Sequence, residues 1–219
     1  MNTFPLDVAH MLAGGMVLVS FMLLYQDRMF ALLNVFALHA VVLSASVAWQ
    51  AYVQNAPHLY VPAAIALVLK GIIIPVALHR VVIRLGIHRG IETVVGIGPT
   101  LLLGVGLTAL SMVVMLKAAE TADPLAREDL AFALSILLLG LLMMVTRRNA
   151  VSQIVGFMSI ENGLILAATA ARGMPLVVEI SVAFSVLAFI VIGVFLFRIR
   201  ERFDSVELQA LDEFRGERR

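Results

Sequence analysis

Apolar stretches long enough to cross a lipid bilayer recur along the whole 219-residue chain. Backbone polar groups in hydrocarbon must be bonded within the protein, so apolar stretches of about 20 residues form helices. The chain is also 61% hydrophobic and only 14% charged, which excludes an ordinary soluble domain. We therefore predict an all-α integral membrane protein with seven transmembrane helices. The predicted spans run from about Leu6 to Tyr25, Met29 to Val53, His58 to Arg84, Thr93 to Leu116, Glu128 to Thr146, Ala150 to Ala171 and Leu176 to Phe197.

The basic side chains are divided unevenly between the two sides that these spans define. Counted from an outside N-terminus, the inside connections and the tail hold 12 of the 16 lysines and arginines, and the outside connections hold three. Cytoplasmic loops of membrane proteins are enriched in these residues. The pattern predicts a multi-pass protein of the cytoplasmic (inner) membrane, with its N-terminus outside and its C-terminus inside. The first span lacks the basic region of a secretory signal and is expected to stay in the mature protein.

The longest connection, between Lys117 and Arg127, suggests a division into parts. We expect residues 1–127 to form a four-helix part, residues 128–198 a three-helix part, and residues 199–219 a cytoplasmic tail. Charges of both signs alternate along the tail. It could lie on the membrane surface or bind a cytoplasmic partner.

Several kinds of chemistry are excluded or unsupported. The chain has no cysteine, which removes disulfides, thiolate metal sites and iron–sulfur clusters. The histidines do not have the spacing of metal ligands, and we expect neither a metal nor another cofactor. A net charge of +1 gives no indication of nucleic-acid binding. We find no arrangement typical of a catalytic triad or a carboxylate pair, so we expect a chain that is not an enzyme by itself.

Glu161 is the most informative single residue. It follows the start of its span by about twelve residues, which places it roughly 18 Å into a hydrocarbon core about 30 Å thick. A charge at this depth costs about 2.5–3.5 kcal/mol on insertion scales and usually marks an ion path. The alternative is a structural carboxyl that is protonated or bonded to Asn162 or another neighbour. Gly156 and Gly163 lie on the opposite face, where small residues allow close helix packing.

Lys70 also lies near the middle of its span. Pro75 follows five residues later and lacks the N–H that would bond the carbonyl of Gly71, so a polar break in the helix is expected. A Lys70–glutamate pair could carry protons or could be a static ion pair that joins two helices.

Two further ionisable residues are candidates for the path. Glu179 lies near the outer end of the last span and would extend a path from Glu161 toward the outside. His39 lies about ten residues into the second span. A single intramembrane histidine more often bonds neighbouring helices than carries protons.

Several motifs resemble a known family. Arg147-Arg148-Asn149, Glu161-Asn162-Gly163 and Val178-Glu179-Ile180, together with the Lys70–Pro75 helix, are similar to component E of the hydrogenase-4 membrane arm. From about residue 128 the chain also resembles the K-type small subunit of respiratory complex I and the C-type subunit of multisubunit cation/proton antiporters. The carboxylate of the complex I subunit aligns with Met158, one helical turn from Glu161 and on nearly the same face.

The resemblance implies a subunit of a proton- or sodium-translocating membrane arm. Its expected partners are antiporter-like and quinone-binding-like subunits, the lipid bilayer, and a cytoplasmic hydrogenase or other redox module that holds the redox centres. The alternatives are a subunit of a cation/proton antiporter, a structural adaptor between antiporter-like subunits, and a self-sufficient secondary transporter. The last usually shows paired halves with broken helices, and only the Lys70–Pro75 helix has such a break.

Overall fold

A computed structural model of the chain describes residues 4–84, 91, 93–118, 124–170, 194 and 198. The chain forms two compact units, Met1–Ser185 and Val186–Arg219. All the helices named below belong to the first unit. The predicted seventh span, Glu179 and the tail lie outside the described residues, apart from the two single positions, so these expectations stay predictions.

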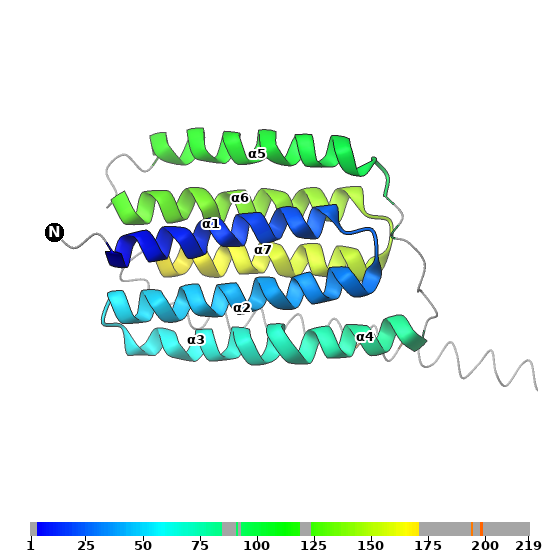
Figure 1. Cartoon of the computed structure of the whole chain (residues 1–219), viewed down its shortest axis with the longest axis horizontal. Coiled ribbons are helices and arrows are strands. Elements are labelled where there is room, and N and C mark those ends of the chain that lie inside the picture. Colours follow the sequence, from blue (N-terminus) through cyan, green and yellow to red (C-terminus); the bar gives the residue numbers. More distant parts are fainter. Residues whose placement is uncertain are drawn as a thin grey trace, which may run out of the picture. The chain divides into compact units, whose positions relative to one another are not determined.

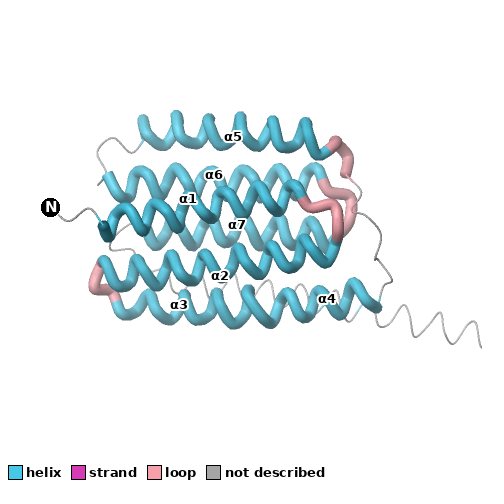
Figure 2. Tube along the Cα trace, in the orientation of Figure 1, coloured by secondary structure: helices cyan, strands magenta, loops and turns pink. Residues whose placement is uncertain are grey.

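The described helices form an all-α bundle, shown in Figures 1 and 2. Among the described residues, six helices are long and apolar enough to cross a membrane, which supports the expected multi-pass membrane protein. The third span combines four short elements into one continuous rod from Pro57 to Ile83. The elements are α1 (Phe4–Tyr25), α2 (Met29–Val53), the 3-10 turn η1 (Pro57–Leu59), α3 (Tyr60–Ile65), the π-helix η2 (Ala66–Ile73), α4 (Ile74–Arg84), α5 (Ile97–Ala118), α6 (Pro124–Thr146) and α7 (Ala150–Ala170).

The helix boundaries agree closely with the predicted spans. The largest differences are in the fourth and fifth predicted spans. The fourth corresponds to α5, which begins at Ile97 rather than Thr93, and the fifth corresponds to α6, which begins at Pro124 rather than Glu128. No strand occurs among residues 4–84, 93–118 and 124–170, where Thr93 and Arg147 make one isolated bridge. The predicted division after residue 127 stays a prediction, although α6 packs against both α1 and α5.

Successive helices run in opposite directions, so their connections collect at two ends of the bundle (Figure 1). α6 packs against α7, α5 and α1, whereas α2 packs against α1, α7 and η2. In its most apolar stretch α7 is 61% buried and α5 only 17%. The chain thus encloses α7 and leaves most of α5 open to its surroundings.

Three connections are tied together at one end, which we call the Arg147 end. The backbone N–H of Ile91 donates to the carbonyl of Asp27 over 2.7 Å, and that of Val94 to the carbonyl of Thr146 over 2.8 Å. These bonds join the connections that follow α1, α4 and α6. Arg28, Arg147 and Arg148 all lie at this end, so the structure groups basic residues that the sequence assigns to one side.

The π-helix η2 shapes the third span. Its backbone is wider than an α-helix, and the N–H of Ile74 donates to the carbonyl of Leu69, five residues back. The irregularity expected at Pro75 therefore takes the form of a π-helix that ends two residues before the proline. Every fourth residue is buried over five turns of this rod: Pro62, Ala66, Lys70, Ile74, Leu78 and Val82.

The π-helix explains this regular spacing. In an α-helix, a step of four residues advances about 40° beyond one full turn, so residues four apart drift around the axis. A wider turn needs more residues to close and rotates the following residues back. Lys70 therefore faces the same side as Ala66 and Ile74. Without η2, the buried residues spaced four apart could not all face α2 at both ends of the rod.

The α6–α7 contact depends on glycines. A Cβ added to Gly156 would lie 3.1 Å from the carbonyl oxygen of Gly140, and one added to Gly163 would lie 3.0 Å from that of Ala133. These backbones touch directly, so neither position has room for a methyl group. The structure thereby places Gly156 and Gly163 against α6.

We predict that Gly156→Ala lowers the free energy of unfolding by about 1–3 kcal/mol, because overpacking forces α6 and α7 apart. Gly15→Ala is the matched control, since nothing lies within 4 Å of an added Cβ there. It should be neutral or stabilising, because alanine favours helix by up to about 1 kcal/mol over glycine. Thermal or denaturant unfolding of the detergent-solubilised protein measures both. Equal stability of the two variants would contradict a tight α6–α7 contact.

Candidate functional site

The centre of the bundle holds a buried ion pair. Lys70 Nζ lies 2.8 Å from Glu161 Oε1, and the two side chains are 0% and 1% exposed. Lys70 is thirteen residues from each end of the span Pro57–Ile83, and Glu161 is eleven residues into α7. Depth along two separate helices could not show that these residues are neighbours. The structure brings the two predicted path residues together near the middle of the membrane.

Asn162 extends this pair toward α2. Lys70 Nζ donates to Asn162 Oδ1 over 2.7 Å, and Asn162 Nδ2 lies 2.8 Å from His39 Nδ1. Both Asn162 and His39 are completely buried. Asn162, expected as a helix-packing or orienting residue, joins the ion pair to the buried histidine.

The hydrogen-bond network continues from His39 to α1. His39 Nε2 lies 3.1 Å from Ser20 Oγ, and Ser20 Oγ donates to the carbonyl of Met16 over 3.0 Å. The five side chains come from four helical elements: Ser20 on α1, His39 on α2, Lys70 on η2, and Glu161 and Asn162 on α7. We call this set the central network.

The chemistry of lysine fixes the direction of every bond in the network. Protonated lysine only donates, so the atom of Asn162 that faces it must be the carbonyl oxygen. The amide N–H₂ of Asn162 then faces His39 Nδ1, which must accept. His39 is consequently the neutral tautomer with its proton on Nε2, and it donates to Ser20. Donation runs in one direction, from Lys70 to the Met16 carbonyl.

The ion pair can exist in two forms that carry no net charge. A proton shared over 2.8 Å can lie on Lys70, which leaves both groups charged, or on Glu161, which leaves both neutral. Asn162 Oδ1 can accept from either form of the lysine. The geometry suits a group that takes up and releases a proton, and it equally suits a static pair. Mutation of one partner separates the two interpretations.

The remaining predicted residues lie around this network or outside the described part of the chain. Pro75 is buried one turn beyond Lys70, and Gly156 and Gly163 hold α7 against α6. Glu179 lies outside the described residues. Among the described residues, no group of three or more histidine or carboxylate side chains could hold a metal ion.

Arg147 is a buried residue that sequence reasoning assigned to a basic loop. It is 2% exposed, and its Nη2 donates to the carbonyl of Leu24 over 2.5 Å. That carbonyl lies in the last turn of α1, where carbonyls lack helical partners and a positive charge is favourable. Burial lowers the pKa of Arg147, and Asp27 opposes that shift. Its neighbour Arg148 is exposed, and nothing in the sequence distinguishes the two arginines.

A second polar cluster, also missed from the sequence, lies at the opposite end of the bundle, which we call the His10 end. Asp129 is 1% exposed and accepts a hydrogen bond from Gln50 Nε2 over 2.7 Å. His10 Nδ1 lies 3.1 Å from Glu128 Oε2. Because the predicted span begins near Glu128, the sequence suggests that the carboxylates of Glu128 and Asp129 both face water. The sequence feature that could have indicated a buried partner for Asp129 was Gln50, an amide near the same end of the apolar helix α2.

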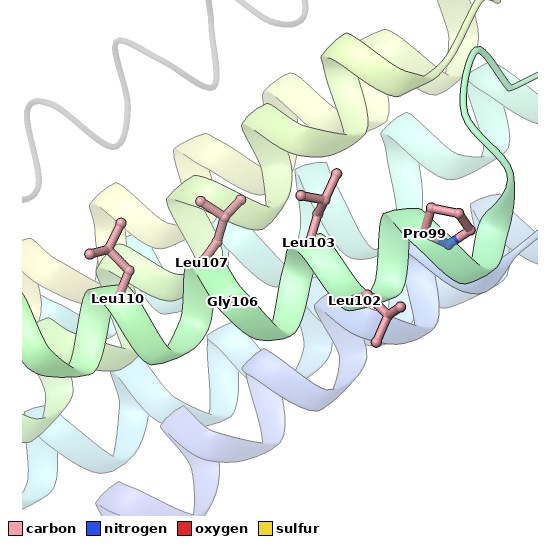
Figure 3. A pocket seen from close by; sticks show the side chains of 6 residues that line it. All are labelled: Pro99, Leu102, Leu103, Gly106, Leu107 and Leu110. Atoms are coloured by element: carbon pink, nitrogen blue, oxygen red, sulfur yellow. The ribbon is translucent and has the colours of Figure 1, made fainter.

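An apolar hollow of about 510 Å³ lies on the outer face of α5 (Figure 3). The described residues that line it all belong to α5: Pro99, Leu102, Leu103, Gly106, Leu107 and Leu110. These side chains offer no charge or hydrogen-bonding group, so the hollow suits a lipid chain or another apolar helix and not an ion.

The chain is 30% identical over 208 residues to a protein of Mycobacterium tuberculosis named "Uncharacterized protein Rv0085". The alignment covers 93% of this chain and 94% of the relative. No family model matches the chain. No solved structure shows a significant match either.

We predict that Lys70→Met destabilises the protein by about 3–5 kcal/mol, because it leaves the Glu161 carboxylate buried without its ion partner. Glu161→Gln should cost less, because its amide keeps the volume and its oxygen can still accept from Lys70. The double variant should cost clearly less than the sum of the two. Unfolding of all four proteins in one detergent gives the coupling free energy. Additive effects would contradict a direct interaction between the two residues.

Proposed function

The chain belongs to the family of the Mycobacterium tuberculosis protein Rv0085, and we propose that it is a membrane subunit of a hydrogenase-4-like or complex I-related assembly that translocates protons or sodium ions. The observation that carries this proposal is the Lys70–Glu161 pair. Both groups are buried at mid-membrane, and ionisable residues at that depth usually belong to an ion path.

The position of the lysine on a π-helix gives further support. Single π-helical turns within helices occur frequently at functional sites. In this chain the π-helix η2 directs Lys70 toward Glu161 and Asn162. A purely structural ion pair could be built on regular helices.

The assignment to a redox-driven arm depends on the sequence resemblance to hydrogenase-4 component E. The motifs that carry it include Lys70, Glu161 and Asn162, which are also the residues that meet in the central network. In this proposal the chain is not an enzyme by itself. Antiporter-like and quinone-binding-like subunits surround it in the cytoplasmic membrane, and a hydrogenase or other redox module holds the redox centres.

One observation favours a second candidate, a structural adaptor between antiporter-like subunits. The central network joins four helical elements through bonds whose directions are all fixed. Such a network would hold a bundle rigid without moving any ion. The two candidates differ in what they require of Glu161. In an ion path Glu161 must take up and release a proton, whereas in an adaptor it need only form hydrogen bonds.

The seven-span orientation has its own test. We expect reporter fusions at Arg148 and after Arg219 to be active on the cytoplasmic side, and a fusion at Asn55 to be active on the other side. The reason is the excess of basic residues in the connections assigned to the inside. If the fusions at Arg148 and Arg219 report opposite sides, the number of spans after α7 is wrong.

The test of function is Glu161→Gln in the whole assembly. The amide keeps the shape and can still accept from Lys70, but it cannot take up a proton. We expect normal assembly with ion pumping reduced by about 10²-fold or more, the order expected for loss of a positioned proton carrier. The measurement is redox-driven proton or sodium uptake in inverted membrane vesicles, with electron transfer followed in the same preparation.

Asp7→Asn is the control for this experiment. Asp7 is an exposed carboxylate in the first turn of α1, remote from the central network. It should assemble and pump like the wild type. If Glu161→Gln also assembles and pumps normally, the adaptor is favoured and the ion path does not use this carboxylate.

A further inference from the structure

The His10 end of the bundle carries titratable side chains that the central network does not use. His10 comes from α1, Gln50 from α2 and Gln54 from the position directly after α2, whereas Glu128 and Asp129 come from α6. Gln54 Nε2 donates to Gln50 Oε1 over 3.0 Å and to the carbonyl of Thr169 on α7 over 2.9 Å. Three helices are thus joined to α7 at one place.

Asp129 is the unusual member of this cluster. Its side chain is enclosed, with the whole residue 1% exposed. Oδ2 accepts from Gln50, but Oδ1 is buried and has no hydrogen-bond partner. Nearly all buried polar atoms in proteins are bonded, so an oxygen without a partner needs an explanation. A carboxyl group that gains and loses a proton provides one.

The neighbours of Asp129 connect it to the surface. Its electrostatic neighbours are His10, from α1, and Glu128, the preceding residue on α6. These two side chains lie 3.1 Å apart and are 26% and 47% exposed. His10 Nε2 is itself buried without a hydrogen-bond partner. Asp129 therefore lies directly inside a pair of titratable groups that reach the surface.

α7 connects this cluster to the ion pair. Thr169 lies eight residues after Glu161, which is about 12 Å along a helix. Asn162 and Gly163 directly follow Glu161 and are also buried; the buried positions of α7 between Gly163 and Thr169 are apolar, Ile165 and Leu166. A proton could cross this distance only through water molecules that enter between the helices. The apolar layer would keep the path closed at other times.

We propose that Asp129 is a second protonation site, through which the Lys70–Glu161 pair exchanges protons with the aqueous phase at the His10 end. This inference depends on the proposed function. In each transfer one carboxyl loses the proton that the other gains, so Asp129 becomes a carboxylate when Glu161 becomes a carboxylic acid, or the reverse. Gln50 can hydrogen-bond either form, because it presents both an N–H and a carbonyl. His10 and Glu128 restore the proton from the surface.

The first test is Asp129→Asn in the whole assembly. The amide keeps the volume and can still meet Gln50, but it cannot titrate. We expect normal assembly with proton uptake reduced by on the order of 10²-fold, while electron transfer continues. Asp7→Asn, which changes an exposed carboxylate in the first turn of α1 at the same end of the bundle, should pump like the wild type. Wild-type pumping by Asp129→Asn, in a preparation where Glu161→Gln has lost it, overturns the inference and leaves the proposed function standing.

If Asp129→Asn does not assemble, a second variant still tests the proposal. In Asp129→Asn combined with Gln50→Glu, the carboxyl and amide exchange helices and keep their hydrogen bond. If a titrating group is what matters, this double variant pumps. An assembled double variant without pumping overturns the inference.

A measurement on the wild-type assembly needs no substitution at all. Hydrophobic carbodiimides add to protonated carboxyl groups in apolar surroundings. We expect modification of Asp129, located by mass spectrometry, to proceed in parallel with the loss of pumping. Pumping that survives complete modification of Asp129, or the absence of any modification there, overturns the proposal. Normal pumping by both Glu161→Gln and Asp129→Asn removes the proposed function and the inference together.

Discussion

The buried ion pair between Lys70 and Glu161 is the constraint that the rest of the bundle must satisfy. Taking two charges out of water costs several kcal/mol for each ion, and their attraction offsets this only with good geometry and further hydrogen bonds. The 2.8 Å contact supplies the geometry, and Asn162 supplies another acceptor for the lysine. Asn162 in turn needs an acceptor for its own N–H, which His39 provides. Each buried polar group thus requires the next as its hydrogen-bond partner, until the backbone carbonyl of Met16 on α1 ends the series of hydrogen bonds.

Two backbone features make this geometry possible. The π-helix η2 keeps every fourth residue of its rod on one face, so Lys70 points inward between the apolar Ala66 and Ile74. On α7, the glycines that touch α6 and the polar residues that meet Lys70 lie on different faces of one enclosed helix. Close contact on the glycine side fixes the depth and rotation of α7. A shift of one residue on either helix would separate the charges, so the packing and the polar network have to be correct together.

Much of this arrangement was predictable from the sequence, and the limits have physical causes. Long apolar runs predict the helices, and a charge in the middle of such a run stands out, as Lys70 and Glu161 do. Which residues pair between helices is harder to predict. The sequence gives the depth of each residue in the membrane, but pairing also depends on how each helix is rotated and which helices are neighbours. Asp129 was missed for a related reason: near the start of a helix a carboxylate can face either water or the interior, and only the position of α2 decides. The same ambiguity hides the burial of Arg147 beside the exposed Arg148.

The direction of donation in the central network bears on where an ion path can run. From Lys70 the donors point through Asn162, His39 and Ser20 to the carbonyl of Met16. A backbone carbonyl accepts a hydrogen bond but does not take up a proton near neutral pH, so this branch ends there. His39 bonds Asn162 at this point, and its place in an ion path stays a prediction. In the proposed ion path, a proton on Glu161 has to leave by another direction. Toward the His10 end, where Thr169 lies about 12 Å along α7 from Glu161 and beyond an apolar layer, the next buried carboxylate among the described residues is Asp129 on α6.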